Sequence, residues 1–152
     1  MTPGRLMESS APVWERIAPS LVKEVTSDRG SFAAYQPKPS AWVFRGRGHL
    51  SIDHVRLIPQ VLDPHIGEGK SVAIYYDCEA MTGFDADARH LAIKWGVAHR
   101  RRLLTIDILI GGSRVVVVGI AAASTAMRVV GVTMHTHMNR SNFENVLSRA
   151  LA

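Results

Sequence analysis

The chain has 152 residues, of which 47% are hydrophobic and 20% charged, and its formal net charge is +5. These values are typical of one globular domain, and they exclude a largely disordered or fibrous chain. The single cysteine, Cys78, excludes an internal disulfide and favours a reducing, cytoplasmic location. The small positive charge does not indicate a nucleic-acid partner, and contact with a membrane surface is only a weak alternative.

The first thirty residues show no clear pattern of a folded element. Residues 1–12 are small and polar, and we expect them to be mobile. They contain no apolar run of the kind that signal peptides carry. Residues 13–25 fit either a short helix or an extra strand, and Pro19 argues against a long helix. We therefore predict a partly flexible N-terminal extension, residues 1–30, followed by one α/β domain, residues 31–152.

Strands and helices are predicted to alternate along the rest of the chain. Apolar β-rich runs between turn residues indicate strands, and apolar residues every three or four positions indicate helices. The predicted strands are 31–36, 41–45, 71–78, 103–110 and 129–137. The predicted helices are 51–62, 85–102, 114–127 and 141–150. The order β-β-α-β-α-β-α-β-α implies a mixed, mostly parallel five-stranded sheet with about four helices.

Prolines and capping residues mark the expected ends of two helices. Pro59 should kink or shorten the helix 51–62, and Pro64 with Gly67 should end it. Ser141 and Glu144 have the spacing of a capping box, which predicts the start of the last helix.

The segment Tyr75–Arg89 has the pattern of a buried strand that ends in an aspartate, then a short loop, then a helix. With the element order, the stretch Ala73–Arg89 resembles the STAS-like family, named for sulphate transporter and anti-sigma factor antagonist domains. The likeness is to its SpoIIAA-like branch, whose fold is also compared with Sec14-type lipid-binding domains. It covers about residues 31–151. The resemblance implies a regulatory protein of bacterial signalling that acts without catalysis.

The phosphorylation site of that branch is missing from this chain. In phosphorylatable anti-sigma antagonists, a Ser or Thr follows an Asp at the start of the second helix. Asp85 matches that Asp, but Ala86 and Asp87 follow it, so no hydroxyl is available. The phospho-switch is therefore not expected here. Asp85 and Asp87 are interpreted first as helix-capping acids, and second as a permanent charge in place of a phosphate.

Two neighbouring segments are the candidate binding surfaces. The expected partner-binding residues are Thr82, Gly83, Phe84, Asp85, Asp87 and Arg89. The helix that contains Val115–Met127 is apolar nearly all round, which is unusual for a helix on a sheet. Such a helix packs against a second subunit or covers an apolar or lipid-like ligand. The residues expected in either role are Val115, Val118, Ala122 and Met127.

Carboxylates and histidines offer a less favoured, catalytic alternative. Asp77, Glu79 and Asp85 follow a buried strand, where α/β proteins place their sites, and a hydrolase would use such a group. His135 and His137 share a strand face but lack a third metal ligand. We therefore predict no catalytic residue, no metal and no cofactor. The leading hypothesis is a regulatory or scaffolding module that acts through contact with another protein and self-association.

Overall fold

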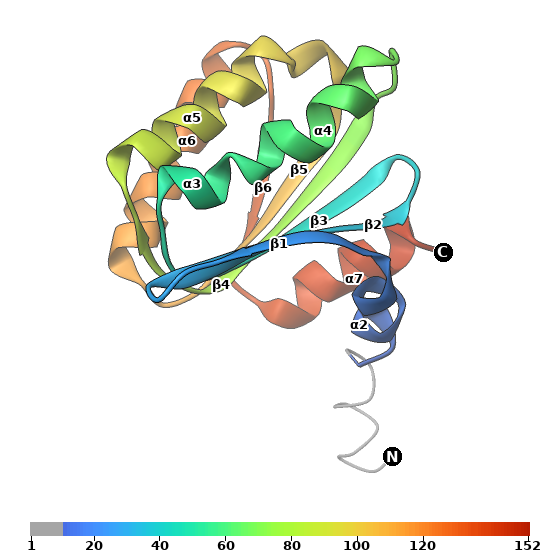
Figure 1. The fold of residues 1–152 in the computed structure, drawn as a ribbon, viewed down its shortest axis with the longest axis horizontal. Coiled ribbons are helices and arrows are strands. Elements are labelled where there is room, and N and C mark those ends of the chain that lie inside the picture. Colours follow the sequence, from blue (N-terminus) through green and yellow to red (C-terminus); the bar gives the residue numbers. More distant parts are fainter. Residues whose placement is uncertain (1–10) are drawn as a thin grey trace.

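The computed structural model describes residues 11–152, which fold around one six-stranded sheet (Figure 1). The strands are β1 (Leu21–Thr26), β2 (Gly30–Lys38), β3 (Ala41–Leu50), β4 (Val72–Phe84), β5 (Leu103–Ile110) and β6 (Met134–His137). They lie across the sheet in chain order. β1, β2 and β3 pair antiparallel, whereas β3, β4, β5 and β6 pair in parallel. The prediction of a mixed, mostly parallel sheet is confirmed.

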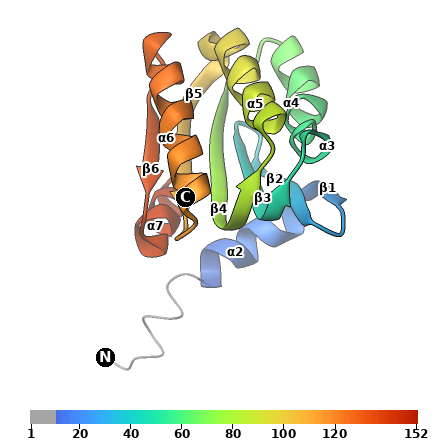
Figure 2. The same cartoon turned by 90° about the vertical axis from the view of Figure 1, so that its left-hand side faces the viewer.

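Helices cover both faces of the sheet (Figure 1). One face carries α3 (Ile52–Val55), α4 (Leu57–Gly67), α5 (Ala86–Ala98) and α6 (Arg114–Val129). The opposite face carries α2 (Ala11–Ile17) and α7 (Arg140–Ala150). Short 3-10 turns, Ala18–Ser20 and Arg100–Arg102, precede β1 and β5. Figure 2 shows α5 and α6 side by side over the parallel strands, and this pair frames the site described below.

The sheet buries an apolar cluster on each face. Because side chains alternate along a strand, Ile74 and Tyr76 of β4 face α5 and α6, whereas Tyr75 and Asp77 face α7. The larger cluster lies under the four helices and includes Phe44, which is fully buried. The two faces of β4 therefore lead to different environments, one apolar and one containing a buried charge.

The sheet has one strand more than expected. β1 lies where the sequence fits both a helix and a strand, and it pairs with β2 at the edge of the sheet. α2 precedes it and buries Val13 and Ile17 in the core. The N-terminal extension thus packs onto the domain from Val13 onward. The expected mobility of residues 1–12 concerns mostly residues outside the described range.

Two strand boundaries differ from the prediction. β4 continues beyond Cys78 to Phe84, so the predicted loop is a strand that pairs with the end of β3. β6 begins only at Met134, because α6 extends to Val129 and ends in a turn. In that turn Gly131 has a φ of +86°, a conformation that glycine adopts at low cost.

The predicted helix 51–62 is two short helices, α3 and α4, which meet at Arg56. Pro59 lies in the first turn of α4, where its missing N–H costs no helical hydrogen bond. Pro64 lies inside α4, which continues to Gly67, so the prediction that Pro64 helps to end this helix is wrong.

Candidate functional site

An apolar cavity of about 130 Å³ lies between the sheet and the helices α5 and α6. Large strand side chains such as Ile74 and Ile108 form its floor. Half of the lining residues of α5 and α6 are small, namely Ala88, Ala92, Gly96, Gly119 and Ala123. Small side chains on two adjoining helices leave space that bulkier residues fill in an ordinary core. The local sequence of α5 and α6 thus creates the cavity.

The walls of the cavity are neutral except at Arg89. Burial raises the pKa of the Cys78 thiol to about 12, and nearby Asp77 adds to this effect. Burial also raises the pKa of the Tyr76 hydroxyl well above its usual value. Both groups therefore keep their protons at neutral pH. Among the described residues that line the cavity, only Arg89 carries a charge, so the interior suits an apolar group.

A surface depression of about 480 Å³ adjoins the cavity where α5 and α6 begin. Its lining consists of Phe84, Ala86, Arg89, Arg114, Val115, Val118 and Gly119. Phe84, Arg89 and Gly119 line the cavity as well. The ring of Phe84 packs so closely on Gly119 that a Cβ atom there would overlap it. Phe84 therefore lies between the depression and the cavity.

The depression brings together members of both predicted surfaces. Phe84 and Arg89, predicted to contact a partner, lie beside Val115 and Val118 of the apolar helix. Val115 and Val118 are 60% and 64% exposed. Met127 is only 3% exposed and lines the cavity, so its position suits a ligand and not a subunit interface.

The other residues predicted for the partner surface lie around the depression. His49 Nε2 donates to Asp85 Oδ1 at 2.7 Å, and this hydrogen bond lowers the pKa of the Asp85 carboxyl. Asp85 occupies the N-cap position of α5, but its side chain makes no capping hydrogen bond, so that detail of the prediction is wrong. Asp87 lies in the first helical turn, where the helix dipole favours its negative charge.

The carbonyl of Thr82 accepts a hydrogen bond from the Ser113 hydroxyl, and this bond joins the end of β4 to the start of α6. The Cα of Gly83 lies next to the ring of His49, which a Cβ atom would approach to 3.1 Å.

Helix α6 has two apolar faces, one directed into the cavity and one exposed. Its inner face lines the cavity, and its outer face carries an exposed row of small and β-branched side chains. The row consists of Val115, Val118, Ala122, Thr125 and Val129. Its members recur at alternating spacings of three and four residues, which is the spacing of a helix–helix contact.

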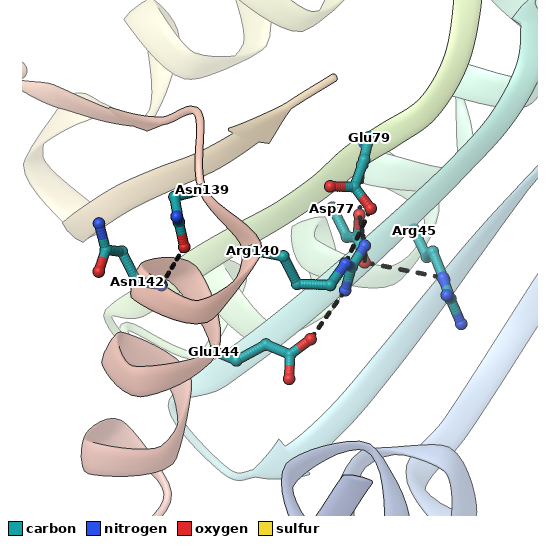
Figure 3. Close-up of polar contacts among 7 residues, drawn as sticks. All are labelled: Arg45, Asp77, Glu79, Asn139, Arg140, Asn142 and Glu144. Carbon is teal, nitrogen blue, oxygen red and sulfur yellow. Dashed lines mark hydrogen bonds and ion pairs between the residues drawn. The ribbon is translucent and has the colours of Figure 1, made fainter. Parts of the chain in front are cut away.

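Two members of the predicted acidic cluster, Asp77 and Glu79, belong to an ion-pair network on the other face of the sheet (Figure 3). Arg140 Nη2 donates to both oxygens of Asp77 at 3.0 Å, and Nε donates to Glu79 at 2.8 Å. Nη1 donates to Glu144 at 3.0 Å, and Arg45 Nε lies 3.7 Å from Asp77 Oδ2. Burial opposes the charge of Arg140, but its hydrogen bonds to Glu79, Asp77 and Glu144 outweigh this and raise its pKa.

This network does not offer an acid–base pair. Both oxygens of Asp77, which is 1% exposed, are held by arginine, and Glu79 accepts from the same guanidinium. Asp85 is bonded to His49 instead. The three carboxylates that the catalytic alternative requires are therefore engaged with different partners.

The histidines of β6 do not form a metal site with their neighbours. His137 Nε2 donates to Asp107 Oδ1 at 2.8 Å, and Asp107 is 5% exposed. Within residues 11–152, no group of three or more His, Cys, Asp or Glu side chains is arranged to hold a metal ion. None of the helices in this range is long and apolar enough to cross a membrane.

The sequence predicts an apolar pocket under α6 as an alternative, but it does not indicate the contribution of α5 to the cavity or the role of Arg140. A signal for the cavity exists in the small residues Ala88, Ala92 and Gly96, which recur at intervals of four on one face of α5. Arg140 and Glu144 have the spacing of a helical ion pair, but their partner Asp77 lies 63 residues before Arg140.

No family model matches the chain, and no curated protein matches it. The structure is similar to the crystal structure of an uncharacterized protein from Shewanella loihica PV-4, of the DUF3478 family, which is described as having a SpoIIAA-like fold. The two chains share 13% sequence identity, and their TM-score is 0.58. The match covers 81% of this chain and 98% of the other. The protein therefore has a SpoIIAA-like fold, as the sequence resemblance predicts, and at this identity the likeness shows the fold alone.

Proposed function

We propose that the protein is a non-catalytic binding module that holds a small apolar molecule under α5 and α6. The observation that carries this proposal is the apolar cavity of about 130 Å³. Engineered cavities of about 150 Å³ with apolar walls stay free of water and bind benzene or xenon. The space thus suits one ring or a short alkyl chain.

The energetic cost of an empty cavity supports a bound ligand at this place. Native interiors contain few voids larger than a water molecule. At about 24 cal/mol per Å³, an empty cavity of this size destabilises the fold by roughly 3 kcal/mol. A bound apolar group would offset this loss by restoring contacts with the walls.

Methyl NMR of protein with labelled methionine tests the proposal. Met81, Met127 and Met134 line the cavity, whereas Met138 is 67% exposed and serves as an internal control. Benzene should shift the three cavity methyl signals in a saturable manner and leave the Met138 signal in place. An absence of saturable shifts would contradict the proposal.

Two leucine substitutions at alanine positions of α6 separate filling of the cavity from a general effect on the helix. Ala123 lines the cavity, and Ala121 is exposed on the same helix. Ala123→Leu should abolish the benzene-induced shifts, because the longer side chain occupies the space. Ala121→Leu should keep them. If both variants bind benzene like the unchanged protein, the ligand lies elsewhere.

The exposed row on α6 supports a second candidate function, a regulatory or scaffolding module that pairs with a second copy of itself. The row is apolar except for Thr125, whose hydroxyl donates to the Ala121 carbonyl. It has the spacing of a helix–helix contact, and a two-fold axis would place it against itself. This role agrees with the bacterial signalling function that the family resemblance implies.

Sedimentation velocity tests this second function. The unchanged protein should form a dimer that Val118→Glu dissociates, since the carboxylate would be buried in the contact. Val22→Glu, at a 50% exposed site on β1, is the matched control and should leave the dimer intact. A protein that stays monomeric at high concentration would exclude self-association.

A further inference from the structure

The depression that adjoins the cavity, called its mouth below, carries charged residues that indicate the chemical class of the ligand. Arg89, from α5, and Arg114, from the first turn of α6, both line the depression. Neither arginine forms an ion pair or a side-chain hydrogen bond with any residue in the described range, whereas Arg45 and Arg140 are paired with carboxylates. Two arginines without a carboxylate partner in the described range, one from each helix, thus line the same depression.

No acidic residue of the described range lines the depression. Asp85 and Asp87 begin α5, but neither lines the depression, and Asp85 is bonded to His49. Helix α6 contains no acidic residue from Arg114 to Val129. The mouth is therefore positive, while the cavity beneath it is neutral and apolar.

The cavity and the depression share three lining residues, Phe84, Arg89 and Gly119. Arg89 lines both the cavity and the depression, so its side chain stands at the boundary between apolar and exposed space. Phe84 lies at the same boundary and packs on Gly119. A molecule that enters past Phe84 would place its apolar part in the cavity and its polar end beside the two arginines.

We infer that the ligand is a small anionic amphiphile, with a ring or short alkyl chain in the cavity and a carboxylate bound by Arg89 and Arg114. This inference rests on the proposed function, because it requires that the cavity binds an apolar group. Arginine binds carboxylates through paired, charge-assisted hydrogen bonds, and two such side chains select an anion over a neutral or cationic end group. The volume of about 130 Å³ limits the apolar part to about the size of benzene.

Calorimetric titration with three probes of equal chain length tests the inference. The probes are hexanoate, hexan-1-ol and hexylamine, which have six carbons each and end in an anionic, a neutral and a cationic group. Hexanoate should bind at least tenfold more tightly than hexan-1-ol, and hexylamine should bind most weakly. The advantage of hexanoate should decrease with added salt, because the mouth is exposed.

Substitutions of arginine locate the anion. The double variant Arg89→Gln with Arg114→Gln should reduce hexanoate affinity to that of hexan-1-ol, without changing the affinity for hexan-1-ol. Arg128→Gln, an exposed arginine near the other end of α6, is the control and should leave all affinities unchanged.

Three results would overturn the inference. Equal affinity for hexanoate and hexan-1-ol, with benzene still shifting the cavity methyl signals, would reject the anionic class and leave the proposed function standing. If the double variant lowers the affinities for hexanoate and hexan-1-ol equally, the two arginines do not bind the carboxylate. If benzene gives no shift, the proposed function and the inference fail together, even if hexanoate binds at the surface.

Discussion

Arg140 is the residue on which the buried charges of the α7 face depend. It donates to Asp77, Glu79 and Glu144, and Asp77 is 1% exposed. A buried carboxylate that loses its partner is strongly destabilising, because it keeps the desolvation cost without the compensating bonds. This network therefore stabilises the packing of α7 on the sheet.

Arg140→Met should lower the free energy of unfolding by about 2–4 kcal/mol, because it leaves Asp77 with Arg45 alone. Urea denaturation measures the change. Arg149→Met on the same helix removes an exposed arginine and should change stability by less than about 0.5 kcal/mol. A similar loss in both variants would show that the network contributes nothing specific.

Cys78 should be inert in the folded protein. With a pKa of about 12, about one thiol in ten thousand is ionised at pH 8, and the thiolate is the reactive form. A disulfide-exchange reagent should therefore label Cys78 only as fast as the protein opens or unfolds. Complete labelling within seconds under native conditions would contradict its place in the cavity wall.

At the residue scale, the sequence indicates which side chains are unusual but not their partners. Asp77 is recognisable as a carboxylate next to a buried strand, and this pattern suggests chemistry. Its partner Arg140 lies far away in sequence, and the parallel pairing of β4, β5 and β6 brings α7 beneath it. The difference between a site and a structural ion pair is thus decided by a long-range contact.

At the scale of elements, the contact between Gly119 of α6 and Phe84 of β4 determines how closely helix and strand approach. Gly119→Ala should destabilise the protein by about 1–3 kcal/mol, since the added methyl group meets the ring of Phe84. Alanine has a higher helix propensity than glycine, which stabilises the helix by about 1 kcal/mol, but the clash with Phe84 should cost more than this gain. Thermal or urea denaturation measures the balance.

Gly67→Ala is the control for this prediction. Gly67 ends α4, and a Cβ atom there meets nothing within 4 Å. The substitution should be neutral or slightly stabilising. If Gly119→Ala is equally harmless, the ring of Phe84 is free to move, and it does not hold the boundary between the depression and the cavity.

Most elements are predictable because their apolar patterns match a helix or a strand. The exceptions have local causes. The end of β4, from Glu79 to Phe84, contains polar and small residues that are typical of a loop. It is nevertheless a strand, because it pairs with the end of β3. β5 ends beside Cys78, so on its other side this segment has no strand partner, and the Thr82 carbonyl accepts from Ser113 at the start of α6 instead. Polar residues are tolerated at such an edge.

At the scale of the whole molecule, the sheet separates two kinds of environment. The face toward α2 and α7 is closed by packed side chains and ion pairs. The face toward α5 and α6 contains the apolar cavity, with a basic depression beside it and an exposed apolar row on α6. Every candidate binding feature proposed above thus lies on one side of the protein. The sequence predicts α6 as the unusual element, but the empty volume depends on how two helices pack and requires the structure.

The most direct test of the central claim is a crystal structure determined under xenon pressure. We expect a xenon atom in the cavity, in contact with Cys78 and Met127, and its loss in the Ala123→Leu variant. A structure with no xenon at this place, and with the side chains of α5 and α6 filling the space, would contradict the claim that the protein binds an apolar molecule there.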